Sequence, residues 1–352
     1  MSDPWRSYKM PGPGEPLREY REPLPQPQGA QVLLRIAACG VCHSDVHIWE
    51  GFFDLGNGRK AELGRNTPMP HTLGHEIAGE VVAVGPEARI AKPGDRRVVY
   101  PWIGCGQCAA CEAGHEEVCT GQPRDLGVRV AGGFSTHVLV PHERYLVDAG
   151  NIPQELACTF ACSGLTAFSA LKKAVPGPLL IVGAGGVGLA AVRMAKEFHG
   201  IAPFVADIDP AKREAALAAG AAQAWDPREK ASLKDLIGAT GGGAASAIDF
   251  VGAPSSTGFA MQAVRRGGKV VVVGLFGGAL ELSLPLLPLR ALTLQGSYVG
   301  PLADLQELVA LARARGAPQI PITPRPLEAA QQSLDDLKEG RVVGRVVLQP
   351  AA

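Results

Sequence analysis

The sequence has little that would direct the chain to a membrane or to a nucleic acid. It begins without an apolar signal segment and contains no run of roughly 18 apolar residues that could span a bilayer. Its 34 basic and 34 acidic side chains balance, and no basic block stands out. A phosphate backbone or an anionic lipid surface is therefore not expected as a partner. We expect a cytoplasmic protein with no nucleic-acid or membrane partner.

Internal repeats are also absent, and so is the composition of a disordered chain. Hydrophobic residues make up 46% and charged residues 19%, enough to bury real cores. A length of 352 residues predicts two domains of ordinary size. The 44 glycines and 29 prolines indicate many turns and short strands.

Four clustered cysteines are the most informative feature that is present. They are spaced C-x2-C-x2-C-x7-C, in a stretch without hydrophobic periodicity, at Cys105, Cys108, Cys111 and Cys119. Four thiolates so close together are the ligands of a closed, tetrahedral structural zinc site. Disulfides or cysteines packed as small apolar residues are the alternatives, but disulfides suit an oxidising compartment. We expect a structural zinc lobe over residues 102–124.

The two halves of the chain show different patterns. Up to about residue 150, short β segments alternate with turns. From about residue 153, apolar strands alternate with Ala-rich helical stretches, such as Leu179–Val182 followed by Val187–Phe198. Strand–helix alternation of this kind specifies a parallel sheet covered on both faces. The tail from Pro301 ends in an apolar strand, Val342–Leu348, which we expect to return to the first domain.

A glycine-rich run joins the first of these strands to its helix. The run has the pattern G-x-G-x-x-G and comprises Gly183, Ala184, Gly185, Gly186, Val187 and Gly188. Such glycines permit a tight turn and a close approach of a pyrophosphate to the helix N-terminus. The next strand is followed by Asp207, a carboxylate that can bind the adenosine ribose and repel a 2′-phosphate. NAD is therefore favoured, although Arg213 keeps NADP open, and a turn that binds no nucleotide is the alternative.

Two further segments and one pair of cysteines concentrate metal-binding residue types. They are Cys39–His47, Leu73–Glu76 and the pair Cys158 and Cys162. A catalytic zinc needs three protein ligands and one open position. Spacing alone does not choose among these cysteines and histidines, and Cys39-x-x-Cys42 could also be a redox pair.

Taken in order along the chain, these motifs resemble one known family. The chain is similar over nearly its whole length to zinc-dependent medium-chain alcohol dehydrogenases, and five matches carry the likeness besides the four cysteines: Gly40–His47, Gly74–Gly79, Ala161–Thr166, Gly183–Gly188 and Gly344–Leu348. The resemblance implies an α/β fold, with a doubly wound Rossmann domain beside a mostly β, GroES-like catalytic domain. The expected division is 1–153 with 297–352 for the catalytic domain, and 154–296 for the NAD-binding domain.

The resemblance also implies roles for individual residues. Cys42, His75 and Cys162 would hold the catalytic zinc, and Glu76 would sit beside it. Ser44 and His47 would carry the alcohol proton outward, and Asp45 would fix His75. His47 as a plain surface histidine is the alternative. Cys39 and Cys158 match no ligand of the family and are expected to be small buried thiols.

Contacts to the cofactor and the substrate follow from the same likeness. His43, Thr166, Lys212 and Arg345 would contact the cofactor, with Arg345 close to Asp45 or to the pyrophosphate. The substrate channel would be lined by Trp49, Phe52, Trp102 and Leu126. Its two indoles favour alkyl or aromatic alcohols, although either indole could belong to the core.

The expected function is reversible oxidation of primary or secondary alcohols, with hydride transfer to NAD and two zinc ions per chain. A polyol or sugar-alcohol dehydrogenase of the same fold is one alternative, and a non-catalytic dinucleotide-binding protein is another. Relatives suggest a homo-oligomer, a tetramer or a dimer, with two cofactor-domain sheets joined edge to edge. A longer loop, residues 53–66, departs from the shortest relatives, and we expect it to alter a rim or a subunit contact.

Overall fold

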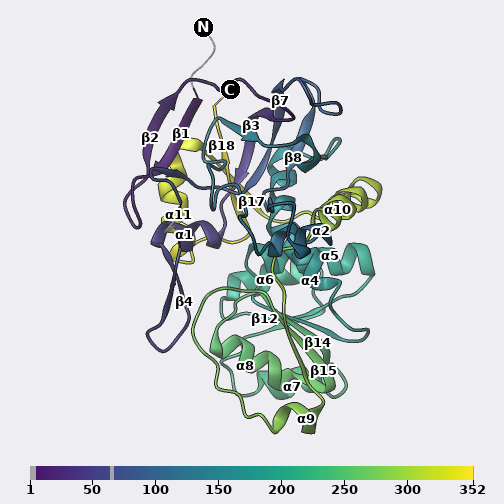
Figure 1. Cartoon of the computed structure of the whole chain (residues 1–352). Coiled ribbons are helices and arrows are strands. Elements are labelled where there is room, and N and C mark those ends of the chain that lie inside the picture. Colours follow the sequence, from purple (N-terminus) through teal and green to yellow (C-terminus); the bar gives the residue numbers. More distant parts are fainter. Residues whose placement is uncertain (1–4, 64–66, 352) are drawn as a thin grey trace.

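The computed structural model describes residues 5–63 and 67–351, and it forms two lobes, one above the other in Figure 1. The upper lobe contains both ends of the chain, because the last strand lies beside strands from the first half. The lower lobe consists of the middle of the chain. The last three residues of the predicted loop 53–66 lie outside the described residues.

The upper lobe is the catalytic domain expected from the sequence, and it is built on a mostly antiparallel sheet. Strands β10, β8, β7, β3, β18 and β17 follow one another in this sheet, and β9 pairs with β3. A smaller sheet has the order β2-β1-β6. The strands are β1 (Trp5–Met10), β2 (Arg18–Glu22), β3 (Val32–Gly40), β6 (His71–Thr72), β7 (Glu76–Val84), β8 (Arg96–Val99), β9 (His137–Val140), β10 (Leu146–Asp148), β17 (Ile322–Pro326) and β18 (Arg345–Gln349).

The expected return of the tail is confirmed. Val347 and Leu348 of β18 pair with Gly40 and Cys39 of β3, so the C-terminal strand lies inside the sheet of the first domain. Its residues Arg345–Leu348 are buried. Two helices of the tail, α10 (Leu302–Arg315) and α11 (Ala330–Lys338), flank the domain, and α11 packs on α1 (His43–Glu50).

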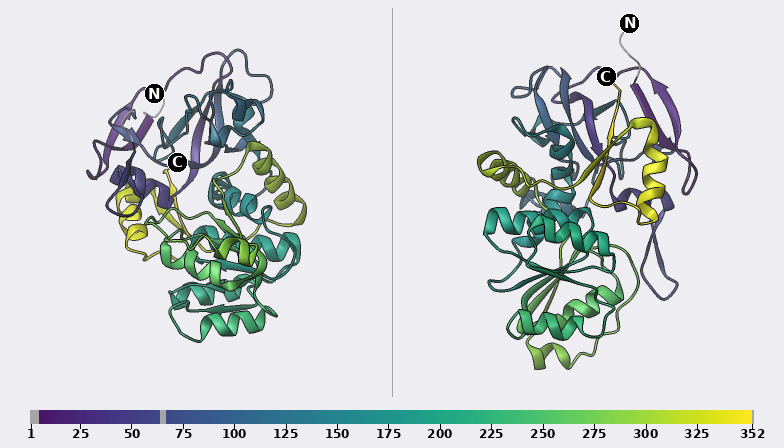
Figure 2. Two further views of the ribbon diagram at one scale, coloured as in Figure 1. Left: turned by 60° about the horizontal axis from the view of Figure 1, so that its bottom comes forward. Right: turned by 180° about the vertical axis from the view of Figure 1, so that it is seen from behind.

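The lower lobe is a six-stranded parallel sheet in the order β13-β12-β11-β14-β15-β16. This is the doubly wound order, in which the first strand is central and the chain reverses direction beside it. Helices cover both faces of the sheet in Figure 2, so a central strand such as β11 is buried throughout. The elements are β11 (Leu179–Val182), α5 (Gly186–His199), β12 (Phe204–Ala206), α6 (Pro210–Ala219), β13 (Gln223–Trp225), α7 (Ser232–Ala239), β14 (Ala244–Asp249), α8 (Pro254–Ala263), β15 (Val264–Val272), α9 (Leu286–Arg290) and β16 (Thr293–Gly296).

The crossing into the cofactor domain lies later than residue 154. The chain first forms α3 (Gln154–Ala157) and the 3₁₀ helix η3 (Cys158–Ala161), and η3 packs on β7 and β8 of the catalytic sheet. The next helix, α4 (Ser163–Leu171), is the first of these segments to pack on α5 of the cofactor domain. Cys162, between η3 and α4, therefore stands where the two domains meet.

The long loop after α1 is a β hairpin rather than a simple rim. Its strands β4 (Phe52–Asp54) and β5 (Lys60–Glu62) pair, and the hairpin reaches down toward the cofactor domain in Figure 1. At its tip, the backbone N–H of Gly278 donates to the Asp54 carbonyl over 3.2 Å. The hairpin therefore joins the two domains, in addition to the rim or subunit contact that was predicted for this loop.

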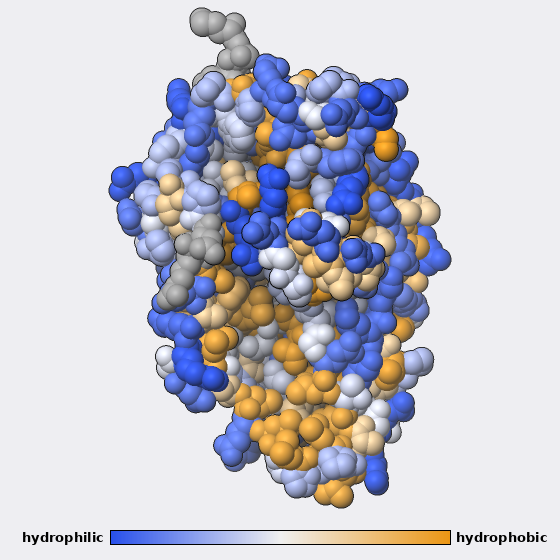
Figure 3. Space-filling view, in the orientation of Figure 1, coloured by the Kyte–Doolittle hydropathy of each residue, from blue (hydrophilic) through white to orange (hydrophobic). Residues whose placement is uncertain are grey.

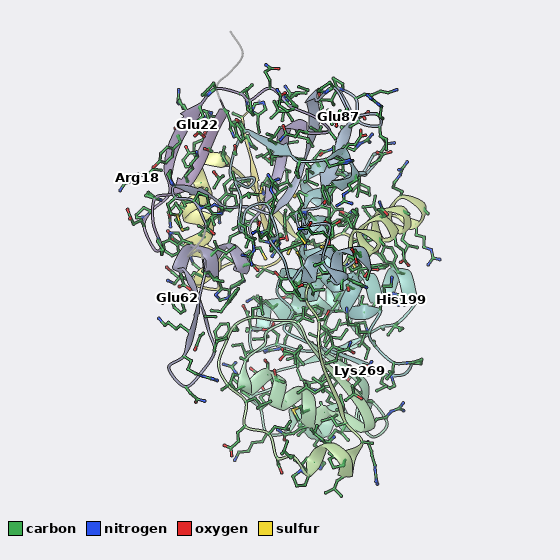
Figure 4. The ribbon with its side chains drawn as sticks, viewed as in Figure 1. Arg18, Glu22, Glu62, Glu87, His199 and Lys269 are labelled. Carbon is green, nitrogen blue, oxygen red and sulfur yellow. The ribbon has the colours of Figure 1, made fainter. Side chains whose placement is uncertain are left out.

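The outer surface carries charges of both signs. Glu22 and Glu87, for example, are exposed at the margin of the catalytic domain in Figure 4. None of the helices in the described part of the chain combines the length and the apolar character needed to cross a membrane.

Candidate active site and metal centres

Three predicted ligands from distant segments meet where the domains join. Cys42 precedes α1, His75 precedes β7 and Cys162 precedes α4. The ligand atoms of Cys42, His75 and Cys162 all lie within 4.8 Å of one another, and the three side chains are buried. Their convergence selects these residues from the candidates that spacing left open. Cys39 and Cys158 are buried free thiols, as expected.

The carboxylate of Asp45 holds two of these ligand segments together. It accepts a hydrogen bond from the backbone N–H of Cys42 over 2.8 Å and from that of Gly74 over 3.1 Å. One of its oxygens also lies 3.1 Å from Nδ1 of His75. Because Asp45 is fully buried, these contacts are its compensation for lost water. The role predicted for Asp45, fixing His75, agrees with this geometry.

The donor set fits a zinc ion. Nε2 of His75 is buried and has no hydrogen-bond partner among the described residues, although the other ring nitrogen is engaged by Asp45. An unpaired buried nitrogen is costly unless a ligand occupies its lone pair. The hydrogen bond from Cys162 lowers the pKa of the Cys42 thiol well below its usual value, which favours the thiolate that a metal requires. Two sulfurs and one imidazole form a three-ligand zinc site.

Glu76 lies beside this centre but is held by Arg345. The Arg345 guanidinium forms a bidentate ion pair with the buried carboxylate. Its Nε lies 3.1 Å from Oε2, and its Nη2 contacts Oε1. The backbone N–H of Ser163 donates to Oε1 over 2.9 Å. Burial raises the pKa of Glu76, and Arg345 opposes that rise. A Cβ on Gly186 would stand 3.2 Å from a terminal nitrogen of Arg345, so the guanidinium also borders the start of α5.

The four-cysteine lobe forms a second cluster. The sulfurs of Cys105, Cys108, Cys111 and Cys119 all lie within 4.8 Å of one another, and none of these cysteines is in a disulfide. The short helices α2 (Ala109–Glu112) and η1 (Glu116–Val118) bring the last two into place. Four converging sulfurs without a disulfide favour the interpretation as a structural zinc site over disulfides or packed apolar cysteines.

The glycine-rich turn has the predicted form. Gly183 has a φ of +87°, which L side chains rarely adopt. A Cβ on Gly188 would collide with the carbonyl of Gly183, so the helix packs on the turn. A Cβ on Gly185 would meet nothing within 4 Å, and Gly186 begins α5. The open backbone at Gly185 and the free helix N-terminus fit a pyrophosphate.

Asp207 stands directly after β12, where the sequence places it. Its carboxylate accepts hydrogen bonds from the backbone N–H groups of Ala184 over 2.6 Å and Asp209 over 2.8 Å. Arg213 donates to the Asp207 carbonyl over 2.8 Å. Lys212 lies 3.8 Å from Asp209, at the start of α6. These contacts place Asp207 and Lys212 beside the nucleotide turn.

Ser44 and His47, the two residues predicted to carry the alcohol proton, lie on α1. Because Ser44 and His47 are three residues apart on this helix, they share one side of it. Burial lowers the pKa of His47, and its ring centroid lies 5.0 Å from that of Phe53. The described residues contain no hydrogen bond from Ser44 to His47. His43 is exposed, while Thr166 is buried one turn after Cys162 and donates its N–H to the Cys162 carbonyl over 2.7 Å.

Two of the predicted channel residues make contacts away from the metal centre. The indole N–H of Trp49 donates to the Glu15 carbonyl over 2.8 Å, and Lys338 lies 5.3 Å from the ring centroid. Trp49 follows His47 by two positions, about 200° around the helix, so it faces α11. Phe52 lies under Lys60, 3.5 Å from its ring centroid. The neighbouring Phe53 contacts His47 instead. Neither contact joins Trp49 or Phe52 to the metal centre, so their place in the channel stays a prediction.

Trp102 does border the metal centre. Its ring centroid is 5.3 Å from that of His75, and its indole N–H donates to the Ala161 carbonyl over 3.2 Å. Leu126 is buried beside it, because its N–H bonds the Pro101 carbonyl over 3.0 Å. Sequence reasoning missed Tyr298, whose ring packs edge-on against Trp102 with centroids 5.8 Å apart. No sequence motif surrounds Tyr298, so its position beside Trp102 became visible only in the three-dimensional structure.

Comparison with known proteins agrees with this geometry. The alcohol dehydrogenase GroES-like domain model matches residues 28–151, and the zinc-binding dehydrogenase model matches residues 186–314. The chain therefore belongs to the zinc-dependent medium-chain alcohol dehydrogenase family. Its α/β fold, a GroES-like domain beside a Rossmann domain, is confirmed.

Individual relatives cover nearly the whole chain. An NAD-dependent alcohol dehydrogenase of Sulfurisphaera tokodaii is 37% identical over 96% of this chain and 97% of its own length. A D-arabinose 1-dehydrogenase (NADP(+)) of Saccharolobus solfataricus is 32% identical over 95% of this chain and 96% of its own. The crystal structure of the alcohol dehydrogenase from the archaeon Aeropyrum pernix superposes with a TM-score of 0.87 at 27% identity, covering 98% of this chain and 100% of that one.

The two cysteine clusters predict separable effects of ligand loss. Cys108→Ser and Cys162→Ser should each reduce the zinc content from two ions per chain to about one, by elemental analysis of zinc-loaded protein. Cys108→Ser should also lower Tm by roughly 10 °C or more, because a structural metal stabilises the lobe that it binds. Cys158→Ser, which changes a buried thiol outside both clusters, is the control and should keep both ions. A zinc content of two after Cys162→Ser would contradict the catalytic site.

Proposed function

We propose that the protein is a zinc-dependent alcohol dehydrogenase that oxidises primary or secondary alcohols to aldehydes or ketones with NAD. The observation that carries this proposal is the unpaired Nε2 of buried His75, which faces the sulfurs of Cys42 and Cys162. That centre lies beside Glu76 and Arg345, and Arg345 in turn borders the nucleotide turn. The relatives named as NAD-dependent alcohol dehydrogenases support the same chemistry.

Zinc at Cys42, His75 and Cys162 would polarise the alcohol oxygen, and NAD would accept the hydride. The chain's own residues perform the remaining tasks. Ser44 would accept the alcohol proton, and His47, on the same side of α1, would receive it nearer the surface. Because burial lowers its pKa, His47 is neutral near pH 7 and can accept that proton.

The other residues would position the reactants and exclude water. Asp45 holds the ring of His75, and Arg345 holds the carboxylate of Glu76. Thr166 and His43 would border the cofactor. Trp102 and Leu126 form the apolar wall for an alkyl or aromatic group, and Phe53 contributes to it.

We also propose a cytoplasmic location, supported by eight free cysteines, of which seven belong to the two metal clusters. Thiolate ligands need a reducing compartment. The four cysteines of the lobe would hold the second zinc, giving two per chain.

A homo-oligomer is proposed from the free edge of the cofactor-domain sheet. Among the described residues β16 pairs only with β15, so its other edge is open. Leucines gather nearby, with Leu284 71% and Leu289 65% exposed, and Figure 3 shows apolar surface at the bottom of the molecule, where α9 lies. An open edge with exposed leucines fits a second copy of the chain joined strand to strand. A tetramer needs a further contact between two such dimers.

The proposed activity predicts a substrate preference. With saturating NAD, the zinc-loaded protein should reduce NAD with 1-hexanol and benzyl alcohol, and kcat/KM for sorbitol should be at least about 10-fold lower, since Trp102 and Leu126 give no partners to the hydroxyls beyond its second carbon. Absorbance of NADH measures each rate. His47→Gln should lower kcat by about 100-fold, as expected for loss of a general base. A preference for sorbitol would instead assign a polyol dehydrogenase.

The position of Asp207 predicts the cofactor preference. Asp207→Gly should raise the ratio of kcat/KM for NADP to that for NAD at least about 10-fold, because the repelling carboxylate is gone while Arg213 remains. Asp207→Asn is the matched variant, since it removes the charge but keeps an acceptor for the Ala184 N–H. Unchanged ratios in both variants would show that the ribose is bound elsewhere.

The apolar edge predicts the assembly state. Light scattering after size exclusion should give an oligomeric mass for the native chain and a smaller one for Leu289→Glu, because a buried charge without a partner opposes association. Ile90, which is 73% exposed on the catalytic domain, provides the control Ile90→Glu, which should keep the native mass. A native monomer, or an unchanged mass for Leu289→Glu, would refute this interface.

A further inference from the structure

The loop that follows the four-cysteine lobe lies along the segment that carries Trp102. The N–H of Arg124 donates to the Ile103 carbonyl over 2.7 Å, and the N–H of Leu126 donates to the Pro101 carbonyl over 3.0 Å. These two bonds make residues 124–126 antiparallel to 101–103. Asp125 is then the residue that lies across from Trp102 in this pairing.

The neighbours of Trp102 show what surrounds this pairing. Its ring lies between His75, with centroids 5.3 Å apart, and Tyr298, with centroids 5.8 Å apart. The charge of Asp125 acts on Tyr298, whose pKa it helps to raise, and Asp125 is in turn affected by His75, so its carboxylate lies near the wall that borders the metal centre. Burial raises the pKa of Asp125 to about 6, while Arg129 and, at longer range, His75 oppose the rise, which agrees with a carboxylate close to the centre.

A carboxylate is unexpected on this wall. Its neighbours are apolar, with Leu126 and Trp102 only 2% and 3% exposed. The side chain of Asp125 is 13% exposed, yet within the described residues its carboxylate has a single hydrogen-bond donor, Nε of Arg129 at 3.3 Å. Arg129 itself is 55% exposed, and an ion pair with a solvated partner contributes little to stability. Desolvation of the Asp125 carboxylate thus lowers the stability of the fold, and no contact evidently compensates for it. Side chains that serve function often have this property.

We propose that Asp125 is a specificity residue that accepts a hydrogen bond from a second hydroxyl of the substrate, next to the carbon being oxidised. This inference rests on the proposed alcohol dehydrogenase activity and narrows its substrate class. The preferred alcohols are 1,2-diols with an apolar remainder, which combine one hydroxyl for Asp125 with an alkyl or aryl group for Trp102 and Leu126. Arg129 balances the charge of Asp125, so a neutral diol suits the wall better than a cationic amino alcohol.

The reaction leaves the second hydroxyl unchanged. A terminal 1,2-diol loses a hydride from C1 to NAD and a proton from the C1 oxygen, and it becomes a 2-hydroxyaldehyde. The C2 hydroxyl only donates its hydrogen bond to Asp125.

The test compares 1,2-hexanediol with 1-hexanol, which differ by that one hydroxyl. The native zinc-loaded enzyme, with saturating NAD, should show a kcat/KM for the diol about 10-fold or more above that for 1-hexanol. Asp125→Leu should lower the value for the diol by about 10- to 100-fold, the usual effect of losing a hydrogen bond to a charged group, and leave that for 1-hexanol within about 3-fold. Asp125→Asn should restore part of the preference, because its amide oxygen still accepts.

A control and a binding measurement separate this inference from a structural role. Asp148→Leu removes another carboxylate paired with arginines, Arg97 and Arg313, on the catalytic domain, and should leave the ratio unchanged. Calorimetric binding of 1,2-hexanediol to the zinc-loaded protein should weaken in Asp125→Leu. An equal loss for both alcohols, a native preference for 1-hexanol, or a preference for 2-amino-1-hexanol over the diol would overturn the proposal. If the native enzyme oxidised neither alcohol, the proposed function itself would fail.

Discussion

One buried carboxylate, that of Asp45, fixes the centre on which the rest of the site depends. It accepts hydrogen bonds from the backbone N–H groups of Cys42 and Gly74 and orients the ring of His75. The start of α1 and the start of β7 are thereby held in one arrangement. Cys162 completes the set from the junction of the domains. Because all these groups are buried, a cation among them would balance their negative charges.

The ion pair of Glu76 and Arg345 extends this constraint to the cofactor. Arg345 begins β18, the strand that returns from the end of the chain, whereas Glu76 begins β7. The guanidinium therefore contacts the metal side through Glu76 and the nucleotide turn near Gly186. A phosphate at that turn would share the charge of Arg345 and loosen its hold on Glu76. Arg345 therefore lies between Glu76 and the start of α5.

Local motifs were predictable, and tertiary pairings were not. Spacing and periodicity in the sequence were enough to predict the four-cysteine cluster, the turn at Gly183 and the early strands. The side that Trp49 and Phe52 face was not predictable in this way, because it depends on the phase of α1 and of the hairpin. Asp125 escaped notice because its place opposite Trp102 comes from a pairing between segments that no sequence period records. The late domain crossing depends likewise on how η3 packs.

The hairpin β4–β5 shows how closely the two domains approach each other beside it. Its contact with the cofactor domain joins main-chain atoms, the N–H of Gly278 and the carbonyl of Asp54. Gly277 and Gly278 both have positive φ, and a Cβ on Gly277 would stand 2.8 Å from the Asp54 carbonyl oxygen. Side chains would thus force the two segments apart. The close backbone approach of the two domains beside the hairpin therefore depends on glycine at position 277.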